Sequence, residues 1–102
     1  MNKAAFEKMK KTAFYINTAR GGVVADADLR AALDAGIIAG AAVDVMATEP
    51  PQEDNPLLNA KNIIITPHIA WATKEARTRM LDIVISNLAA WQEGKPVNVV
   101  GG

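Results

Sequence analysis

The sequence predicts an α/β fold in which a parallel sheet lies between layers of helices. Short apolar runs at residues 13–16, 37–45 and 62–65 alternate with segments of helical periodicity, an order typical of parallel strands joined by helices. The run at 37–45 is almost continuously apolar, which indicates a strand buried on both faces. With 102 residues, half of them hydrophobic, the chain can form one modest core, as a single domain or a part of one.

A short helix and a strand are expected near the amino terminus. Phe6 and Met9 lie three positions apart, with most of the charged residues elsewhere, so residues 3–10 are predicted to form a helix. The apolar run at 13–16 follows as the first strand, and Asn17 closes it.

A helix of about three turns is expected between residues 26 and 36. Asp26 can cap its start, and Gly36 suits a left-handed stop. Its apolar stripe has i, i+3, i+4 spacing and consists of Leu29, Ala32 and Leu33. The strand at 37–45 comes next, and loop signals then dominate residues 48–62, where proline and polar residues are concentrated.

The longest helix is predicted over residues 74–93. Thr73 is placed to cap it, Glu75 lies near its positive end, and the residues at 94–96 stop it. Its apolar residues occupy a wider arc than one flat sheet face requires: Met80, Leu81, Ile83, Val84, Ile85, Leu88 and Trp91. We therefore expect this helix to pack against two separate parts of a protein, or against one part and a second copy.

Composition narrows the classes of function. Eleven Lys and Arg balance eleven Asp and Glu without a block of like charge, so we expect a small-molecule partner and no nucleic acid. The chain has no cysteine and one histidine, His68, so no metal site is predicted. No apolar stretch approaches the ~20 residues of a membrane span. Residues 1–11 also lack the apolar core of a signal peptide, so we expect a cytoplasmic protein.

Candidate functional residues follow each predicted strand. In a parallel α/β fold, ligands bind beyond the carboxyl ends of the strands. The loops there carry Arg20 after the first strand, Asp44 and Glu49 after the second, and His68 after the third. An acid such as Asp44 at the mouth of a buried strand has either a task in the site or a role as an Asx-turn cap.

Three motifs in these loops occur in a recognisable order. They read INTARGG from residue 16, GAAVDVMATEP from residue 40 and TPHIAWAT from residue 66. Together they resemble the carboxyl-terminal signatures of the D-isomer-specific 2-hydroxyacid dehydrogenases, and WAT after PHIA is most similar to the glycerate dehydrogenase or hydroxypyruvate reductase branch. The resemblance covers nearly the whole chain. It implies the second half of a Rossmann-type NAD-binding domain, with three parallel strands, flanking helices and a long carboxyl-terminal helix.

The resemblance also implies parts that the sequence does not contain. Family members carry a GxGxxG phosphate loop and a separate substrate domain, and the glycines here do not form that loop. We therefore expect residues 1–102 to be the carboxyl-terminal part of such a cofactor domain, inactive alone. An unpaired edge of the strand at 13–16 would favour self-association, most simply as a homodimer. The alternative is an autonomous self-associating α/β module with a vestigial site.

The resemblance assigns catalytic roles to three residues. His68 is similar to the family's acid/base histidine, Glu49 to the acid that orients it, and Arg20 to the arginine that holds the substrate carboxylate. The chemistry suits these residue types, because imidazole titrates near neutrality and a guanidinium binds two oxygens at once. The expected substrate is a small 2-oxo or 2-hydroxy acid, with glycerate, hydroxypyruvate or glyoxylate favoured. Plainer interpretations remain: a surface arginine on a turn, a solvated loop glutamate, and a hydrogen-bonded histidine at a strand end.

The implied cofactor is NAD or NADP, with NAD favoured. Its nicotinamide end is expected near seven residues: Thr18, Ala19, Arg20, Asp44, His68, Ala70 and Trp71. Trp71 has two interpretations, as a wall of the substrate pocket or as a packing anchor at a domain or subunit contact.

Overall fold

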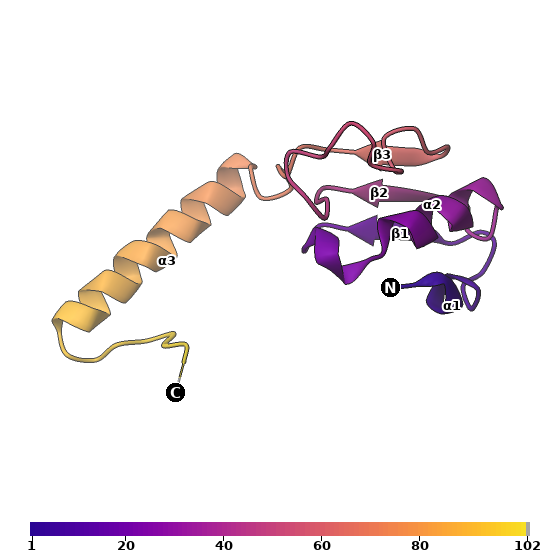
Figure 1. Cartoon of the computed structure of the whole chain (residues 1–102). Helices are drawn as coiled ribbons and strands as arrows, with labels where there is room; N and C mark the ends of the chain where they lie inside the picture. Colours follow the sequence, from indigo (N-terminus) through magenta and orange to yellow (C-terminus); the bar gives the residue numbers. More distant parts are fainter. Residues whose placement is uncertain (102) are drawn as a thin grey trace. The chain divides into compact units, whose positions relative to one another are not determined.

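The computed structural model describes residues 1–101, which divide into two compact units, Met1–Ala70 and the segment from Trp71 onward. The elements of the first unit are α1 (Lys3–Phe6), β1 (Phe14–Asn17), the 3-10 helix η1 (Gly21–Val23), α2 (Asp26–Asp34), β2 (Gly40–Val43) and β3 (Ile63–Ile65). The second unit contains α3 (Lys74–Gln92) (Figure 1). Within residues 1–101, no helix has both the length and the apolar character needed to cross a bilayer.

The three strands form one sheet in the order β1-β2-β3, and both pairs are parallel. The register places Tyr15 opposite Ala41, and Ala41 opposite Ile63. Because the strands run the same way, the loops that follow them all leave from one end of the sheet. The prediction of a parallel α/β fold is confirmed, and so is the common position of the three candidate loops.

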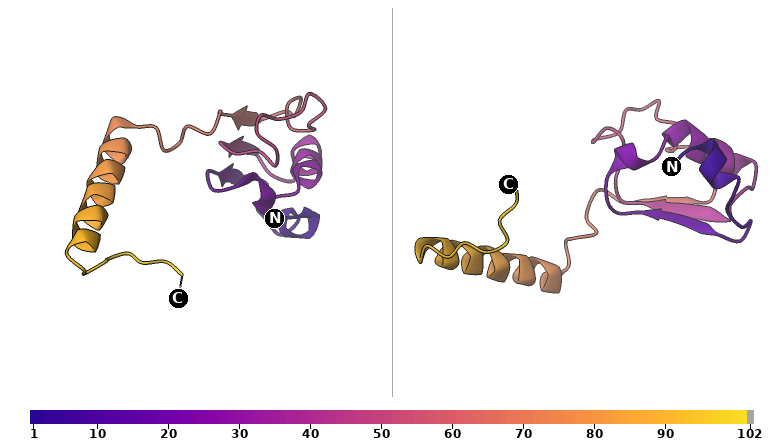
Figure 2. Two further views of the ribbon diagram at one scale, coloured as in Figure 1. Left: turned by 60° about the vertical axis from the view of Figure 1, so that its left-hand side comes forward. Right: turned by 90° about the horizontal axis from the view of Figure 1, so that it is seen from below.

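Helices α1 and α2 cover one face of the sheet (Figure 2). The predicted stripe of α2 is buried, and the ring of Phe6 from α1 meets that of Tyr15 edge to face at a centroid distance of 5.5 Å. The core consists of Phe6, Tyr15, Val24, Leu29, Ala32, Leu33, Ile38, Ala41, Val43, Met46 and Leu57. Leu57 belongs to the long loop before β3, so burial of this side chain ties that loop to the core.

The opposite face of the sheet is bare within the first unit. Phe14, Ile16 and Ile64 are 68%, 69% and 67% exposed. Side chains alternate between the two faces along a strand, so buried Tyr15 and exposed Ile16 mark the two faces of β1. Within Met1–Ala70, α1 and α2 pack against each other on the same face of the sheet. The expectation of a helix layer on the opposite face stays a prediction.

Two predicted elements of the first unit are too long. The helix expected over 3–10 ends at Phe6 and continues as turns. The strand expected over 37–45 is restricted to Gly40–Val43. Its start is delayed because the N–H of Ile37 donates to the carbonyl of Ala32 at 2.9 Å, which closes the end of α2.

The limits of α2 differ from the prediction at one end only. The cap residue is Ala25, without a side-chain hydrogen bond, whereas Asp26 is already the first helical residue. The Asp26 carboxylate instead accepts a hydrogen bond from the side-chain amide of Asn55 at 2.8 Å. At the other end Gly36 has φ +63°, the predicted left-handed stop.

Helix α3 begins and ends as its local signals predict. The Thr73 hydroxyl accepts a hydrogen bond from the N–H of Ala76 at 3.2 Å, and Gly94 has φ +71° after the last turn. No residue of α3 is buried. The expectation that this helix packs against two separate parts, or against one part and a second copy, stays a prediction.

Candidate active site

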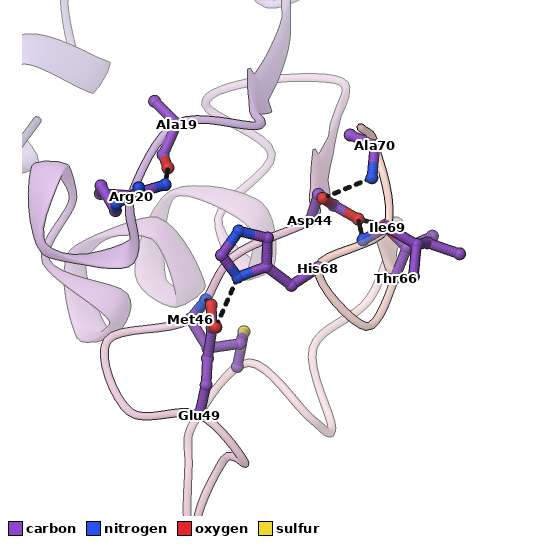
Figure 3. A network of polar contacts seen from close by, with 9 residues as sticks. All are labelled: Ala19, Arg20, Asp44, Met46, Glu49, Thr66, His68, Ile69 and Ala70. Atoms are coloured by element: carbon purple, nitrogen blue, oxygen red, sulfur yellow. Dashed lines mark hydrogen bonds and ion pairs between the residues drawn. The ribbon is translucent and has the colours of Figure 1, made fainter. Parts of the chain in front are cut away.

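Residues from all three strand ends meet in one polar network (Figure 3). Arg20 lies in the loop after β1, Asp44 directly follows β2 with Glu49 five residues further on, and His68 lies in the loop after β3. Their proximity results from the parallel register, since neighbouring strands end at the same edge of the sheet.

His68 and Glu49 form the central pair of the network. The imidazole Nδ1 lies 2.7 Å from Glu49 Oε2, and the two side chains are 39% and 37% exposed. The other carboxylate oxygen, Oε1, accepts a hydrogen bond from the N–H of Met46 at 2.9 Å. The hydrogen bond to His68, followed by that from Met46, holds the pKa of Glu49 below its usual value. An ionised Glu49 thus fixes the ring orientation of His68 through Nδ1.

Asp44 connects the end of β2 to the loop that carries His68. One oxygen of its buried carboxylate accepts hydrogen bonds from the Thr66 hydroxyl and from the N–H of Ile69, the latter at 3.0 Å. The other accepts from the N–H of Ala70 at 2.8 Å. The Thr66 hydroxyl is the main cause of a pKa for Asp44 below its usual value, and the two N–H groups lower it further. The ionised Asp44 carboxylate therefore holds residues 66–70 in place through these hydrogen bonds.

The loop after β1 is shaped by a buried asparagine. The Asn17 side chain donates to the carbonyl of Arg20 and accepts from the N–H of Ala19, both at 3.0 Å. Arg20 itself donates from Nη1 to the carbonyl of Ala19 at 2.7 Å. This turn sets the backbone from which the guanidinium extends.

Gly21 allows that loop to lie directly on the loop after β2. A Cβ at this position would come within 2.0 Å of the Met46 backbone carbonyl, so the two backbones touch where only glycine fits. A Cβ added at Gly22 would meet no atom within 4 Å. The close approach at Gly21 brings Arg20 to the side of the network where Glu49 and His68 lie.

The predicted site residues line several cavities at this end of the sheet. Asp44, Glu49 and His68 together line one of about 380 Å³. A second cavity of about 380 Å³ is shared by Arg20, Glu49 and His68, with walls from Gly21, Gly22, Met46 and Ala47. A hollow of about 210 Å³ is shared by Thr18, Asp44 and Ala70, and its walls come from the bare sheet face and the loop after β3: Ile16, Ala42, Val43, Ile64, Thr66 and Ile69.

The remaining predicted residues are placed differently. Ala19 supplies its backbone to the turn at Asn17. Trp71 is the first residue of the second unit.

Sequence reasoning missed four residues that build the site: Asn17, Gly21, Met46 and Thr66. Asn17 and Thr66 each stand at the carboxyl end of a predicted strand, a signal by which they could have been found. Gly21 and Met46 act through their backbones, and nothing in their local sequence indicates the contact. In the part of the chain that the structure describes, no group of three or more His, Cys, Asp or Glu is arranged to hold a metal ion.

Comparison with known proteins shows the family to which the sequence is related. Residues 1–70 match the family model described as D-isomer specific 2-hydroxyacid dehydrogenase, NAD binding domain. The chain is 50% identical over 100 residues to a hydroxypyruvate reductase of Blautia hydrogenotrophica, covering 98% of the chain and 31% of that protein. It is 51% identical over 96 residues to a glycerate dehydrogenase of Methylorubrum extorquens, covering 92% of the chain and 31% of that protein.

A solved structure supports the same relationship at the level of the fold. The NADPH-dependent glyoxylate/hydroxypyruvate reductase SmGhrB from Sinorhizobium meliloti, solved in complex with citrate, superposes with a TM-score of 0.83 at 36% identity. The match covers 98% of the chain and 32% of the reductase, so the chain spans about a third of the length of the proteins that it resembles. The chain belongs to the D-isomer specific 2-hydroxyacid dehydrogenase family, and residues 1–70 match the NAD binding domain of that family.

Proposed function

We propose that the chain provides the acid/base side of an active site that transfers hydride between a nicotinamide cofactor and a D-2-hydroxy acid or its 2-oxo counterpart. Glycerate with hydroxypyruvate, or glyoxylate, is the favoured substrate. The observation that carries the proposal is the His68–Glu49 contact of 2.7 Å in a cavity that Arg20 also lines. These are the groups that reduction of a 2-oxo acid requires: a proton donor, an acid to orient it and a cation for the carboxylate.

Each of the three side chains has a distinct task in this proposal. His68 holds the proton that goes to the substrate carbonyl oxygen during reduction and takes it back during oxidation. Glu49 keeps the imidazole oriented through Nδ1 and stabilises its protonated form, in the way that a carboxylate supports the histidine of a hydrolase triad. Arg20 binds the substrate carboxylate with two N–H groups, which a lysine cannot do in the same geometry.

The hollow beside Asp44 fits the nicotinamide end of NAD or NADP. It combines apolar walls from the bare sheet face with polar groups of Thr18 and Asp44 at the strand ends. Thr18, Ala19, Arg20, Asp44, His68, Ala70 and Trp71 would hold this end of the cofactor. When bound, the nicotinamide would supply or accept the hydride. We favour NAD over NADP.

The proposal extends to the organisation of the protein. Residues 1–102 would form the carboxyl-terminal part of a Rossmann-like cofactor domain, and a cytoplasmic location agrees with the absence of cysteine. Because the sequence contains no GxGxxG loop, most of the dinucleotide's binding groups find no partner in it. We expect no NADH-dependent reduction of hydroxypyruvate by the 102-residue chain alone.

A chimera tests the catalytic roles directly. Residues 1–102 would replace the matching segment of the Blautia hydroxypyruvate reductase, and NADH oxidation with hydroxypyruvate would be followed by absorbance. We expect the chimera to be active and His68→Gln to lower kcat by about 10² to 10⁴-fold, because general acid catalysis is lost. Arg20→Lys should chiefly raise KM for hydroxypyruvate.

The matched control is Glu53→Gln, which removes an exposed carboxylate from the same loop as Glu49. It should leave both constants unchanged, whereas Glu49→Gln should lower kcat. An active chimera whose kcat survives His68→Gln would contradict the assignment of the proton donor.

A second candidate function is an autonomous module that associates with a copy of itself. The observation that favours it is the bare sheet face of Phe14, Ile16 and Ile64, next to an edge of β1 that pairs with no strand among residues 1–101. Light scattering at micromolar concentration should then give a homodimer, and Ile16→Lys should dissociate it. A folded, monodisperse monomer of the unchanged chain would rule this candidate out.

A further inference from the structure

The backbone of His68 adopts a conformation that needs support from its neighbours. Its φ is +55°, in the left-handed region that residues with a side chain rarely occupy. Such a conformation persists only where the surrounding structure holds it. The support comes from both flanks of His68, since Asp44 accepts hydrogen bonds from Thr66 on one side and from Ile69 and Ala70 on the other.

Thr66 has two contacts that act on this loop. Its hydroxyl donates to Asp44 Oδ1, and its carbonyl accepts the N–H of His68 itself at 3.0 Å. The first contact attaches the start of the loop to the end of β2. The second closes a tight turn over Pro67, so the position of Thr66 sets the position of the His68 backbone.

We propose that Thr66 is a positioning residue for His68, acting through its hydroxyl bond to Asp44. The hydroxyl holds the loop closed on the Asp44 carboxylate, and the closed loop holds the imidazole within reach of Glu49. The catalytic meaning of this link rests on the proposed function, but the link from Thr66 to the His68–Glu49 pair does not. Valine at position 66 has nearly the shape of threonine without the donor, and serine keeps the donor.

Titration of the Glu49 carboxyl measures the link without any assay of activity. Carbon-13 NMR of the glutamate-labelled chain follows this carboxyl, whose pKa is lowered first of all by His68. We expect Thr66→Val to raise the pKa of Glu49 toward its usual value, because the histidine moves away. Thr66→Ser should restore the lowered pKa, and Thr78→Val, which removes a hydroxyl from α3, should have no effect.

Folding is checked in the same samples by circular dichroism and by the amide spectrum. If Thr66→Val does not fold, Asp44→Asn weakens the same contact from its other side, and it should likewise raise the pKa of Glu49. A folded Thr66→Val chain, or in its place a folded Asp44→Asn chain, with an unchanged Glu49 titration overturns the proposal.

The chimera separates this proposal from the proposed function. In an active chimera Thr66→Val should lower kcat roughly 10- to 100-fold, because the proton donor is displaced, with little change in KM. Thr66→Ser should recover most of the rate. An inactive chimera combined with the expected Glu49 shift would reject the function and keep the link. An active chimera without that shift would reject the link and keep the function.

Discussion

The two units of the chain use their apolar residues in opposite ways. In Met1–Ala70, residues from α1, α2 and the long loop are almost fully enclosed, among them Phe6, Leu29 and Leu57. In α3 no residue is buried, although the helix carries seven large apolar side chains: Met80, Leu81, Ile83, Val84, Ile85, Leu88 and Trp91. The apolar stripe of α2 thus lies in the core of its own unit, whereas the apolar side chains of α3 are exposed.

Helices α2 and α3 consequently depend on different interactions. Helix α2 has nine residues and a narrow stripe that packs on the sheet, so tertiary contacts stabilise it. Helix α3 has 19 residues, a capping threonine and a glycine stop, which are local signals. The loss of a capping side chain costs a helix about 0.5 to 2 kcal/mol, so changes in these signals should be measurable in α3.

Leucine truncation should give the largest difference between the units. Leu29→Ala empties a position with 0% exposure and should lower the free energy of unfolding of the first unit by about 2 to 5 kcal/mol. Leu88→Ala, at a position that is 55% exposed, should change stability by no more than about 0.5 kcal/mol. The free energy of unfolding of both variants is measured by urea titration, with amide hydrogen exchange of β1 and β2 as the probe of the first unit. Equal losses would show that the units share one core.

A pair of adjacent glycines should give an intermediate effect within the first unit. Gly21→Ala places a Cβ 2.0 Å from the Met46 carbonyl carbon, so the loops after β1 and β2 must separate. The expected cost is about 1 to 3 kcal/mol, with a loss of the hydrogen bond between Met46 and Glu49. Gly22→Ala meets open space and serves as the control. Thermal unfolding and the Met46 amide signal report the two effects, and equal stability of the variants would disprove the close approach.

The cap of α3 should give the smallest effect. Thr73→Ala removes the hydroxyl that accepts from Ala76, and it should destabilise the first turns of the helix by about 1 kcal/mol. Thr78→Ala, inside the helix, should be neutral or slightly stabilising, because alanine has the higher helix propensity. Amide exchange in α3 resolves the two variants. Faster exchange in β1 as well would mean that the two units unfold together.

The sequence by itself determined the elements whose signals are local. The stripe of α2, the left-handed stop at Gly36 and the cap and end of α3 depend on residues within a few positions of each other, and they were predicted correctly. The alternation of strands and helices also predicted the parallel sheet and the three loops that carry Arg20, Asp44 and His68. Local signals misled at Asp26, since its carboxylate binds Asn55, which is 29 residues away.

Only the tertiary structure decided how the site is assembled. Glu49 and His68 are 19 residues apart, and Asp44 and Ile69 are 25 apart, so their contacts depend on strand register and on the path of the loops between. The contact of Gly21 with Met46 is of the same kind, because it joins the backbones of two loops. The bare face of the sheet was also decided at this level, since the hydrophobic pattern shows that a strand has two apolar faces but not which helices will cover them. Periodicity and capping are properties of neighbouring residues, whereas the site results from contacts between residues far apart in the sequence.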